Sequence, residues 1–211
     1  MAAEQIATRG YAGETLLTHA VDSTRRVVQG FLIASLIGML VGLAMGSYRR
    51  VDWFLNPIVQ LLRPIPPLAW IPLAILWFGL GDTSKIFVAW LAVFTPTVIN
   101  TYTGVRGVDR TLIAAARVHG ARSLDVVLEV AVPSAMPLIF AGLKLSLQVA
   151  WMAVVASELV GARSGLGYVM MAAARDLASP MIVVSMICVA LLGLVSTQIL
   201  TMVEHRVIRW R

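Results

Sequence analysis

The stretch from Val27 to Tyr48 reads VVQGFLIASLIGMLVGLAMGSY and contains no charged residue. At about 1.5 Å of rise per residue, an α-helix of this length crosses the roughly 30 Å hydrocarbon core of a bilayer. Its apolar residues run on without the strict alternation of a membrane β-strand. The stretch therefore predicts a transmembrane helix.

Four more apolar runs follow this first one along the chain. Three of them are also uncharged and cover residues 64–81, 86–105 and 177–203, and the fourth, residues 130–157, is interrupted only by Lys144. Only helices and closed barrels satisfy every backbone polar group in lipid, and long runs without alternation exclude the barrel. We therefore predict an all-α integral membrane protein with five transmembrane helices.

The composition agrees with a membrane protein. Hydrophobic residues make up 59% of the 211 residues and charged residues 13%, and the mean hydropathy is +0.84, whereas an ordinary soluble domain is about 25% charged. The net charge is +6, but the basic residues lie in short connectors rather than on one face, so we do not expect nucleic acid as a partner. Cys188 is the single cysteine and is expected to be a small buried apolar residue.

The arginines in the connectors predict the orientation, because cytoplasmic loops carry the excess of Lys and Arg. Three regions are expected to be cytoplasmic, the last of them placing the C-terminus there: Arg49, Arg50 and Arg63; Arg106, Arg110, Arg117 and Arg122; and Arg206, Arg209 and Arg211. A thinner set is expected on the outer side: Lys85, Arg163, Arg175, Arg9, Arg25 and Arg26. Within the N-terminal segment 1–26, residues 15–26 suggest an interfacial helix that leads into the first span.

Small residues and prolines mark two of the spans. The first span has a small residue at every fourth position, which predicts close packing against another helix backbone: Gly30, Ala34, Gly38, Gly42 and Gly46. The second span contains Pro64, Pro66, Pro67 and Pro72, which remove backbone donors and bend or break a helix. These prolines either open a cavity at membrane depth or only shape an entry turn.

The connector from Arg106 to Pro133 divides at Gly120 into two short helical segments. Asp109 and Ser123 are suited to cap the two segments, Asp125 follows in the first turn of the second, and Gly120 suits a left-handed helix end. The connector is either a module that docks a soluble partner or a solvated loop.

The spacing Ala115-Ala116, three residues, Gly120, nine residues, Val130-x-Val132-Pro133 resembles the cytoplasmic EAA loop of ABC importer permeases, with Ala114 where that family has Glu. The resemblance implies an ATPase-coupling loop over residues 106–129 within a single permease domain over residues 1–211. Its coupling residues would be Ala114, Ala115, Ala116, Arg117, His119, Gly120, Ala121, Arg122, Ser123 and Asp125.

A second motif, RPIPPLAWIPL over residues 63–73 followed by LWFG over 76–79, is similar to the taurine, sulfonate and nitrate branch of the same family. This likeness covers roughly residues 16–203. It implies a type I permease fold in the bacterial inner membrane, two copies of the chain, two ATPase subunits and a periplasmic or lipoprotein binding protein. The solute would be a small oxoanion, and ATP with Mg would bind to the partner ATPase rather than to this chain. Members of this branch usually carry one more upstream helix, so we expect a five-helix variant or a start site placed too late.

A polar stripe on the fourth span is our candidate for the translocation pathway. Lys144, Gln148, Trp151, Val155 and Glu158 follow helical spacing, and a charge inside the bilayer marks either a pathway or a paired structural charge. Glu158 could belong to a gate or pair with Arg163. Asn100 of the third span and Trp70 complete the candidate set, although polar residues in spans more often bond neighbouring helices.

No catalytic or metal site is expected. His19, His119 and His205 are far apart in the sequence and share no ligand spacing. A membrane enzyme would need convergent nucleophilic or acid and base groups, which the spans do not show. An ion-coupled secondary transporter of small anions remains the alternative, and only Glu158 is placed to serve as its coupling carboxylate.

Overall fold

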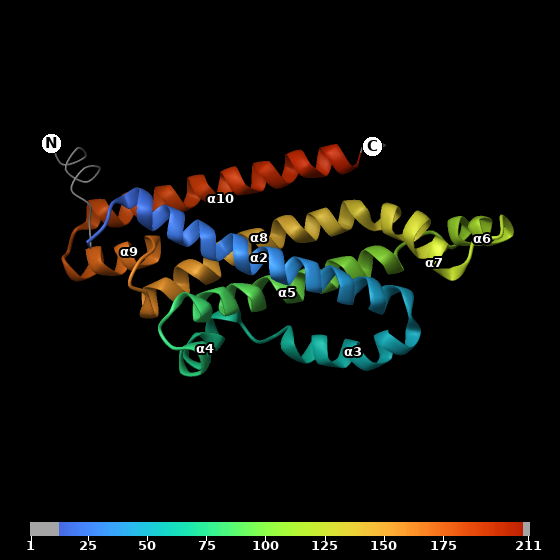
Figure 1. The fold of residues 1–211 in the computed structure, drawn as a ribbon, viewed down its shortest axis with the longest axis horizontal. Helices are drawn as coiled ribbons and strands as arrows, with labels where there is room; N and C mark the ends of the chain where they lie inside the picture. Colours follow the sequence, from blue (N-terminus) through green and yellow to red (C-terminus); the bar gives the residue numbers. More distant parts are fainter. Residues whose placement is uncertain (1–12, 209–211) are drawn as a thin grey trace.

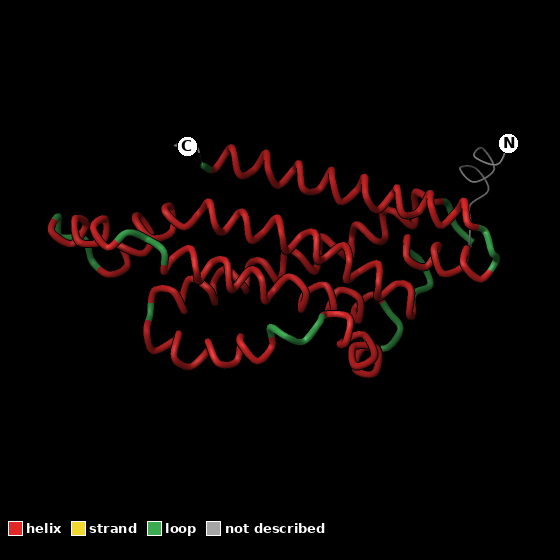
Figure 2. Tube along the Cα trace, turned by 180° about the vertical axis from the view of Figure 1, so that it is seen from behind, coloured by secondary structure: helices red, strands yellow, loops and turns green. Residues whose placement is uncertain are grey.

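The computed structural model describes residues 13–208. Arg9, Arg209 and Arg211, which entered the predicted orientation, lie outside that range. The described residues form a bundle of helices joined by short loops, without β-strand ladders (Figures 1 and 2). In chain order the helices are α2 (Leu16–Ser47), α3 (Arg49–Leu62), a 3₁₀ turn (Pro67–Trp70), α4 (Ile71–Phe78), α5 (Asp82–Arg106), α6 (Arg110–Val118), α7 (Ser123–Asp125), a π-helical turn (Val126–Ala131), α8 (Val132–Gly161), α9 (Leu166–Arg175) and α10 (Ser179–Val207).

Four helical stretches in the described range are long and apolar enough to cross a membrane. They are α2, α5, the run from α7 through α8, and α10. A fifth span results if α3 and the Pro67–Phe78 segment count as one crossing, although these two pieces meet at 85°. The prediction of an all-helical membrane protein with five spans is thus confirmed, with the second span broken.

The break in the second span follows from its prolines. The chain leaves helical geometry after Leu62 and resumes it at Pro67. Proline removes a helix donor and disfavours helical geometry in the residue before it, and Pro64, Pro66 and Pro67 fall in this interval. The run 64–81 is therefore not one straight helix, and it can complete a crossing only together with α3.

The close packing predicted for the first span is present between α2 and α5. A Cβ built on Gly42 would lie 2.6 Å from the Cβ of Thr101, and one built on Gly30 would lie 2.6 Å from the Cβ of Ala89. Gly38 and Gly46 face α5 in the same way. The two helix backbones therefore meet along most of their length, as small residues allow in a membrane.

The first helix begins earlier than the sequence suggested. The Thr15 side chain accepts a hydrogen bond from the backbone N–H of Thr18, and α2 then continues unbroken to Ser47. His19, Ser23 and Arg26 of its first turns are buried. The segment 15–26, expected as an interfacial helix, is thus continuous with the first span, and three of its polar side chains are buried against other helices.

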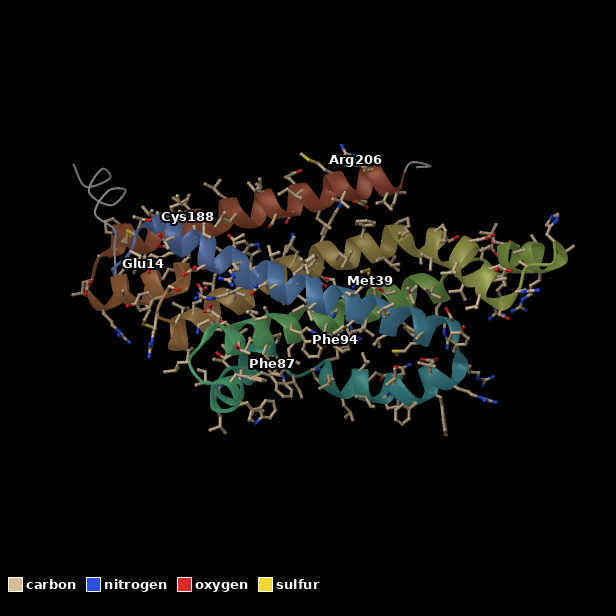
Figure 3. All side chains as sticks on the ribbon, viewed as in Figure 1. Glu14, Met39, Phe87, Phe94, Cys188 and Arg206 are labelled. Carbon is tan, nitrogen blue, oxygen red and sulfur yellow. The ribbon has the colours of Figure 1, made fainter. Side chains whose placement is uncertain are left out.

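Buried apolar residues of α2, α5 and α8 form a common core, and α3, α4, α9 and α10 lie around it (Figure 1). Aromatic rings continue along α5, with Phe87 stacked on Trp90 at 6.0 Å and Trp90 on Phe94 at 5.1 Å between ring centroids (Figure 3). The most apolar window of α10 is only 6% buried, and Cys188 on this helix is half-buried rather than buried as expected. The helix α10 therefore presents a wide apolar surface to lipid or to another chain.

Candidate functional site

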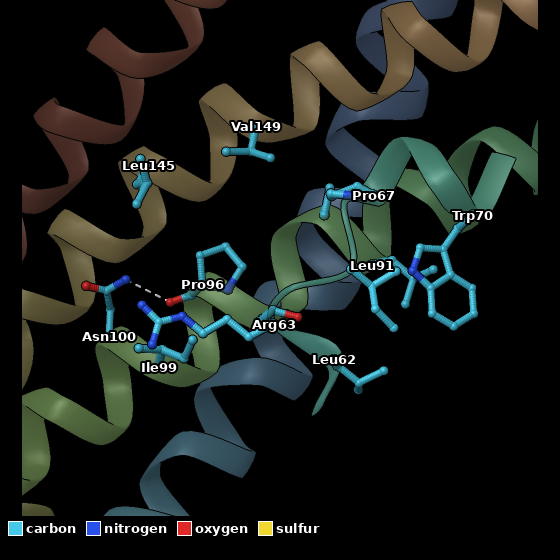
Figure 4. Close-up of a pocket in the computed structure, with 13 residues that line it drawn as sticks. Leu62, Arg63, Pro67, Trp70, Leu91, Pro96, Ile99, Asn100, Leu145 and Val149 are labelled. Atoms are coloured by element: carbon cyan, nitrogen blue, oxygen red, sulfur yellow. Dashed lines mark hydrogen bonds between the residues drawn. The ribbon is translucent and has the colours of Figure 1, made fainter. Parts of the chain in front are cut away.

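A cavity of about 310 Å³ lies at the break in the second span, and we call it the break cavity. Three parts of the chain form it: the residues between α3 and α4, the middle of α5, and the middle of α8 (Figure 4). Its lining residues are Leu62, Arg63, Ile65, Pro67, Trp70, Leu91, Ala92, Thr95, Pro96, Ile99, Asn100, Leu145 and Val149. The wall is thus largely apolar, with a few polar groups.

Arg63 is the one ionisable residue in the lining of the break cavity. Among the described residues, no side chain or carbonyl hydrogen-bonds or pairs with its guanidinium. Its side chain extends along α5 toward Asn100 (Figure 4). The Nδ2 of Asn100 donates to the carbonyl of Pro96 at 2.8 Å, so one amide N–H and the amide oxygen carry no protein partner in the described range.

Arg63, which the sequence predicts in a cytoplasmic connector, lies beside the middle of α5 in the structure. It lies between the two pieces of the broken span and beside Pro96, which is ten residues from the end of α5 at Arg106. Ten helical residues correspond to about 15 Å along the helix, so Arg63 lies near the middle of the bundle rather than at its end. Counting arginines along the sequence could not reveal this position of Arg63, because the counting assumes that each apolar run is a straight span.

Of the residues predicted to line the pathway, Asn100 and Trp70 lie in the break cavity and the others do not. Lys144 forms an ion pair with Glu204 of α10, and Trp151 Nε1 donates to Ser196 Oγ of α10 at 3.0 Å. Gln148 is exposed. The polar residues of α8 therefore do not line one common pathway in this structure. Lys144 and Trp151 contact α10, Gln148 is exposed, and Glu158 is buried.

Glu158 is 1% exposed and lies at the α9 end of the bundle. Its carboxylate accepts hydrogen bonds from Arg26 Nη1 at 2.6 Å, from Ser23 Oγ at 2.9 Å and from the backbone N–H of Gly167 at 2.9 Å. Arg26 also pairs with Asp82 of α5 and donates to Ser164. We call these side chains the Glu158 network. The partner of Glu158 is thus Arg26 and not Arg163.

The loop 106–129 projects beyond the other end of the bundle (Figure 1). Its first helix, α6, is capped as predicted, because Asp109 Oδ1 accepts from the backbone N–H of Thr111 at 2.9 Å. This hydrogen bond holds the pKa of Asp109 below its ordinary value. Gly120 adopts φ +85°, the predicted left-handed conformation.

The second half of the loop differs from the sequence prediction by one residue. Arg122, and not Ser123, is the N-cap of α7, and its backbone N–H donates to Asp125 Oδ2 at 2.8 Å. The helix then continues through the π-helical turn into α8. Pro133 lies where the π-helical turn passes into α8, and its missing donor is tolerated there because the hydrogen-bonding pattern of the helix changes.

The surface of the loop is apolar in several places. Val118 is 85% exposed, Leu124 62% and Leu128 65%. None of the ten predicted coupling residues is buried; Ala116, Ala121 and Asp125 are half-buried, and the rest are exposed. An apolar surface of this kind outside the spans is typical of a docking site for another protein.

No group of three or more His, Cys, Asp or Glu side chains within residues 13–208 is arranged to hold a metal ion. The three histidines lie on α2, at the end of α6 and near the end of α10.

Comparison with known proteins gives a consistent result. The model of the family described as binding-protein-dependent transport system inner membrane component matches residues 34–209. A putative ABC transporter permease protein of Methanocaldococcus jannaschii is 40% identical over 198 residues, which are 93% of this chain and 74% of that protein. The taurine transport system permease protein of Escherichia coli K12 is 36% identical over 96% of this chain and 74% of its own length.

Two further matches concern a nitrate importer and a solved structure. The nitrate import permease protein of Synechococcus elongatus is 36% identical over 82% of this chain and 63% of that protein. The fold also matches a chain in an inward-facing structure of the MetNI methionine ABC transporter, with a TM-score of 0.75 and 19% identity over 92% of this chain and 94% of the other.

Proposed function

Because the chain belongs to the family of binding-protein-dependent transport system inner membrane components, we propose that it forms the translocation pathway of an ATP-driven importer for a small oxoanion. The chain is a non-catalytic, multi-pass permease subunit of the ABC importer class, and ATP is hydrolysed by a separate chain. Under this proposal it binds no cofactor itself, and ATP with Mg is bound by the partner.

The main support for this proposal is the exposed loop 106–129. Its two short helices project beyond the bundle with Val118, Leu124 and Leu128 open to solvent. A soluble ATPase that covers these side chains would stabilise the complex by burying apolar surface. The ten residues from Ala114 to Asp125 are proposed to form this contact, so that movement of the ATPase is transmitted through the continuous helix into α8.

The proposed docking of an ATPase to the loop 106–129 also determines the orientation of the chain in the membrane. If the loop 106–129 faces the cytoplasm, five crossings place the start of α2 outside and the end of α10 inside. The C-terminus is then cytoplasmic, in the inner membrane of a bacterial cell, and the α9 end faces the binding protein. We further propose two copies of this chain with two ATPase subunits and one periplasmic or lipoprotein binding protein, which alternate between outward and inward states.

The proposed solute class is a small oxoanion. Relatives named for taurine and nitrate are each 36% identical to this chain, and sulfonate and nitrate share a compact negative group with several acceptor oxygens. Taurine, an alkanesulfonate and nitrate are therefore the first solutes to test. The break cavity, with Asn100 and Trp70, is proposed as part of the pathway.

An ion-coupled secondary transporter is less well supported. Such a protein needs a carboxylate that binds a proton or a cation within the pathway. The break cavity has no Asp or Glu in its lining, and Glu158 is engaged by Arg26, Ser23 and Gly167.

Co-purification tests the proposed assembly. The tagged full-length chain is isolated in mild detergent after crosslinking, and its partners are identified by mass spectrometry. We expect an ATPase and a solute-binding protein with the wild type, and loss of the ATPase with Val118→Asp. Leu177→Asp is the matched control, because Leu177 is 88% exposed but lies between α9 and α10 at the opposite end. Absence of an ATPase from the wild-type sample, or equal loss in both variants, would contradict the proposed docking site.

Reconstitution tests the solute. The purified complex in liposomes is expected to accumulate taurine, an alkanesulfonate or nitrate only when ATP and the loaded binding protein are present. Accumulation that instead follows an imposed proton or sodium gradient would favour the secondary transporter.

A further inference from the structure

The break cavity contains a cation, Arg63, near the middle of the bundle, with no protein counterion among the described residues. We propose that the guanidinium of Arg63 binds the anionic head of the transported solute inside the membrane, and this inference rests on the proposed function. The Asn100 amide contributes a second polar contact, and Trp70 forms part of the wall.

The location of Arg63 is the first argument. Charged side chains within a bilayer are costly unless they pair with another group or face water. Lys144, which the sequence analysis places inside a span, is paired with Glu204. Arg63 is exposed and unpaired in the described part of the chain, and it opens onto a cavity rather than onto a second helix. A hydrated pathway that admits an anion removes this penalty.

The shape of the guanidinium is the second argument. Its planar fork presents parallel N–H donors that match two oxygens of one oxoanion, whereas an ammonium group acts as a point charge. Asn100 has one amide N–H free after donating to Pro96, and it lines the same cavity as Arg63 (Figure 4). Sulfonate, nitrate and carboxylate groups all satisfy this geometry.

The rest of the wall narrows the class of solute. The volume of about 310 Å³ is near the lower limit for small-molecule pockets. Leu91, Leu145 and Val149 line it with aliphatic groups, which suit a short organic substituent. Because the lining contains no carboxylate, a purely cationic solute finds no partner for its charge inside the cavity.

Thiol labelling tests the electrostatics of the cavity without requiring a known solute. Thr95→Cys is introduced into a Cys188→Ala background of the full-length chain in its complex, since Thr95 lines the cavity and Cys188 is the single native cysteine. Anionic and cationic methanethiosulfonate reagents are then compared. We expect several-fold faster modification by the anionic reagent, and loss of that preference with Arg63→Gln.

Arg50→Gln is the matched control for this measurement. It removes the same charge from an exposed position in the first turn of α3, away from the break cavity, so the anion preference should persist. The proposal is overturned if neither reagent reaches the thiol introduced by Thr95→Cys in any nucleotide state, or if Arg63→Gln leaves the preference unchanged.

Uptake provides the second measurement. In the reconstituted importer, Arg63→Gln is expected to lower the uptake of taurine or nitrate by about tenfold or more, as loss of one charge-assisted contact predicts, and Arg63→Lys to lower it less. Receptor-stimulated ATP hydrolysis serves as the check on folding and assembly. Wild-type uptake with undiminished uptake in Arg63→Gln would overturn the anion site and leave the proposed function standing. If the wild type imports neither probe, the proposed solute class fails, and the labelling preference alone decides whether Arg63 forms an anion site.

Discussion

The carboxylate of Glu158 lies 2.6 Å from Nη1 of Arg26, although 132 residues separate the two in the chain. Glu158 is near the end of α8 and Arg26 is in the third turn of α2. The same carboxylate accepts from the backbone N–H of Gly167, and Arg26 reaches Asp82 at the start of α5. Two ion pairs and one backbone hydrogen bond therefore join α2, α5, α8 and the start of α9 at the end of the bundle that we propose to face the binding protein.

Removing the Glu158 carboxylate is expected to destabilise the protein strongly. In Glu158→Ala, Arg26 remains buried at 4% exposure without its closest counterion, and breaking a buried pair from one side costs about 3–5 kcal/mol. The measurement is the thermal unfolding midpoint in detergent. Glu129→Ala, an exposed carboxylate with no ion pair in the described structure, is the control and should leave the midpoint near that of the wild type. Equal midpoints for the two variants would contradict a structural role for the Glu158 network.

The close contact between α2 and α5 predicts that alanine in place of Gly42 destabilises the protein, whereas alanine in place of Gly193 does not. In Gly42→Ala the new methyl group would lie 2.6 Å from the Cβ of Thr101 and 2.7 Å from the carbonyl oxygen of Val98, so the two helices must separate. We expect a loss of about 1–3 kcal/mol in the free energy of unfolding, the usual range for overpacking.

Gly193→Ala on α10 is the control for Gly42→Ala, because the nearest neighbouring atom would lie 3.9 Å from the new methyl group. It should be neutral or slightly stabilising, since alanine favours the helix by up to about 1 kcal/mol over glycine. Unfolding of both variants followed by circular dichroism compares them. A Gly42→Ala protein as stable as Gly193→Ala would show that the backbones are not in close contact.

The cap of α6 is expected to weaken at acid pH. Because the N–H of Thr111 lowers the pKa of Asp109 in the folded protein, the stabilising contribution of the carboxylate is present above the unfolded pKa and is lost as pH falls through the folded pKa. Hydrogen exchange of the Thr111 amide should show less protection in Asp109→Ala at neutral pH. Asp109→Asn should keep the protection, since asparagine caps helices about as well as aspartate, and should remove its dependence on acid pH. Protection that is unchanged in Asp109→Ala would mean that the cap does not hold α6.

The Lys144–Glu204 pair decides between the two roles considered for Lys144. We expect Lys144→Met and Glu204→Gln to destabilise the protein singly and to compensate each other in the double variant, with a coupling of about 0.5–3 kcal/mol, as for residues in direct contact. We also expect the double variant to retain uptake, because neither side chain lines the break cavity. A stable double variant without uptake would instead place Lys144 in the pathway.

Several features were predictable because they depend on nearby residues alone. The absence of charge over residues 27–48 specifies a membrane helix wherever that helix packs, and glycine at every fourth position specifies a face that admits another backbone. Asp109 and Gly120 mark the two ends of α6 through hydrogen bonds and dihedral angles within a few residues. The two ends of α6 could therefore be located without knowledge of the fold.

The candidate pathway was only partly predictable. Helical spacing correctly places Lys144, Trp151 and Glu158 along one helix, but it cannot say which neighbour each one meets. The structure directs Lys144 and Trp151 to α10 and Glu158 to α2. Asn100 and Trp70 reach the break cavity because α5 and the 3₁₀ turn converge there.

The sequence by itself determined that this chain crosses a membrane about five times through helices and carries a helical loop suited to a soluble partner, because hydrophobic length, capping and turn chemistry act locally along the chain. Only the tertiary structure decided which charges are paired and at what depth they lie. Arg26 and Glu158 meet across 132 residues, and Arg63 reaches the middle of the bundle because the second span breaks at its prolines and turns by 85°. Such positions depend on how distant segments pack, and no local pattern contains that information.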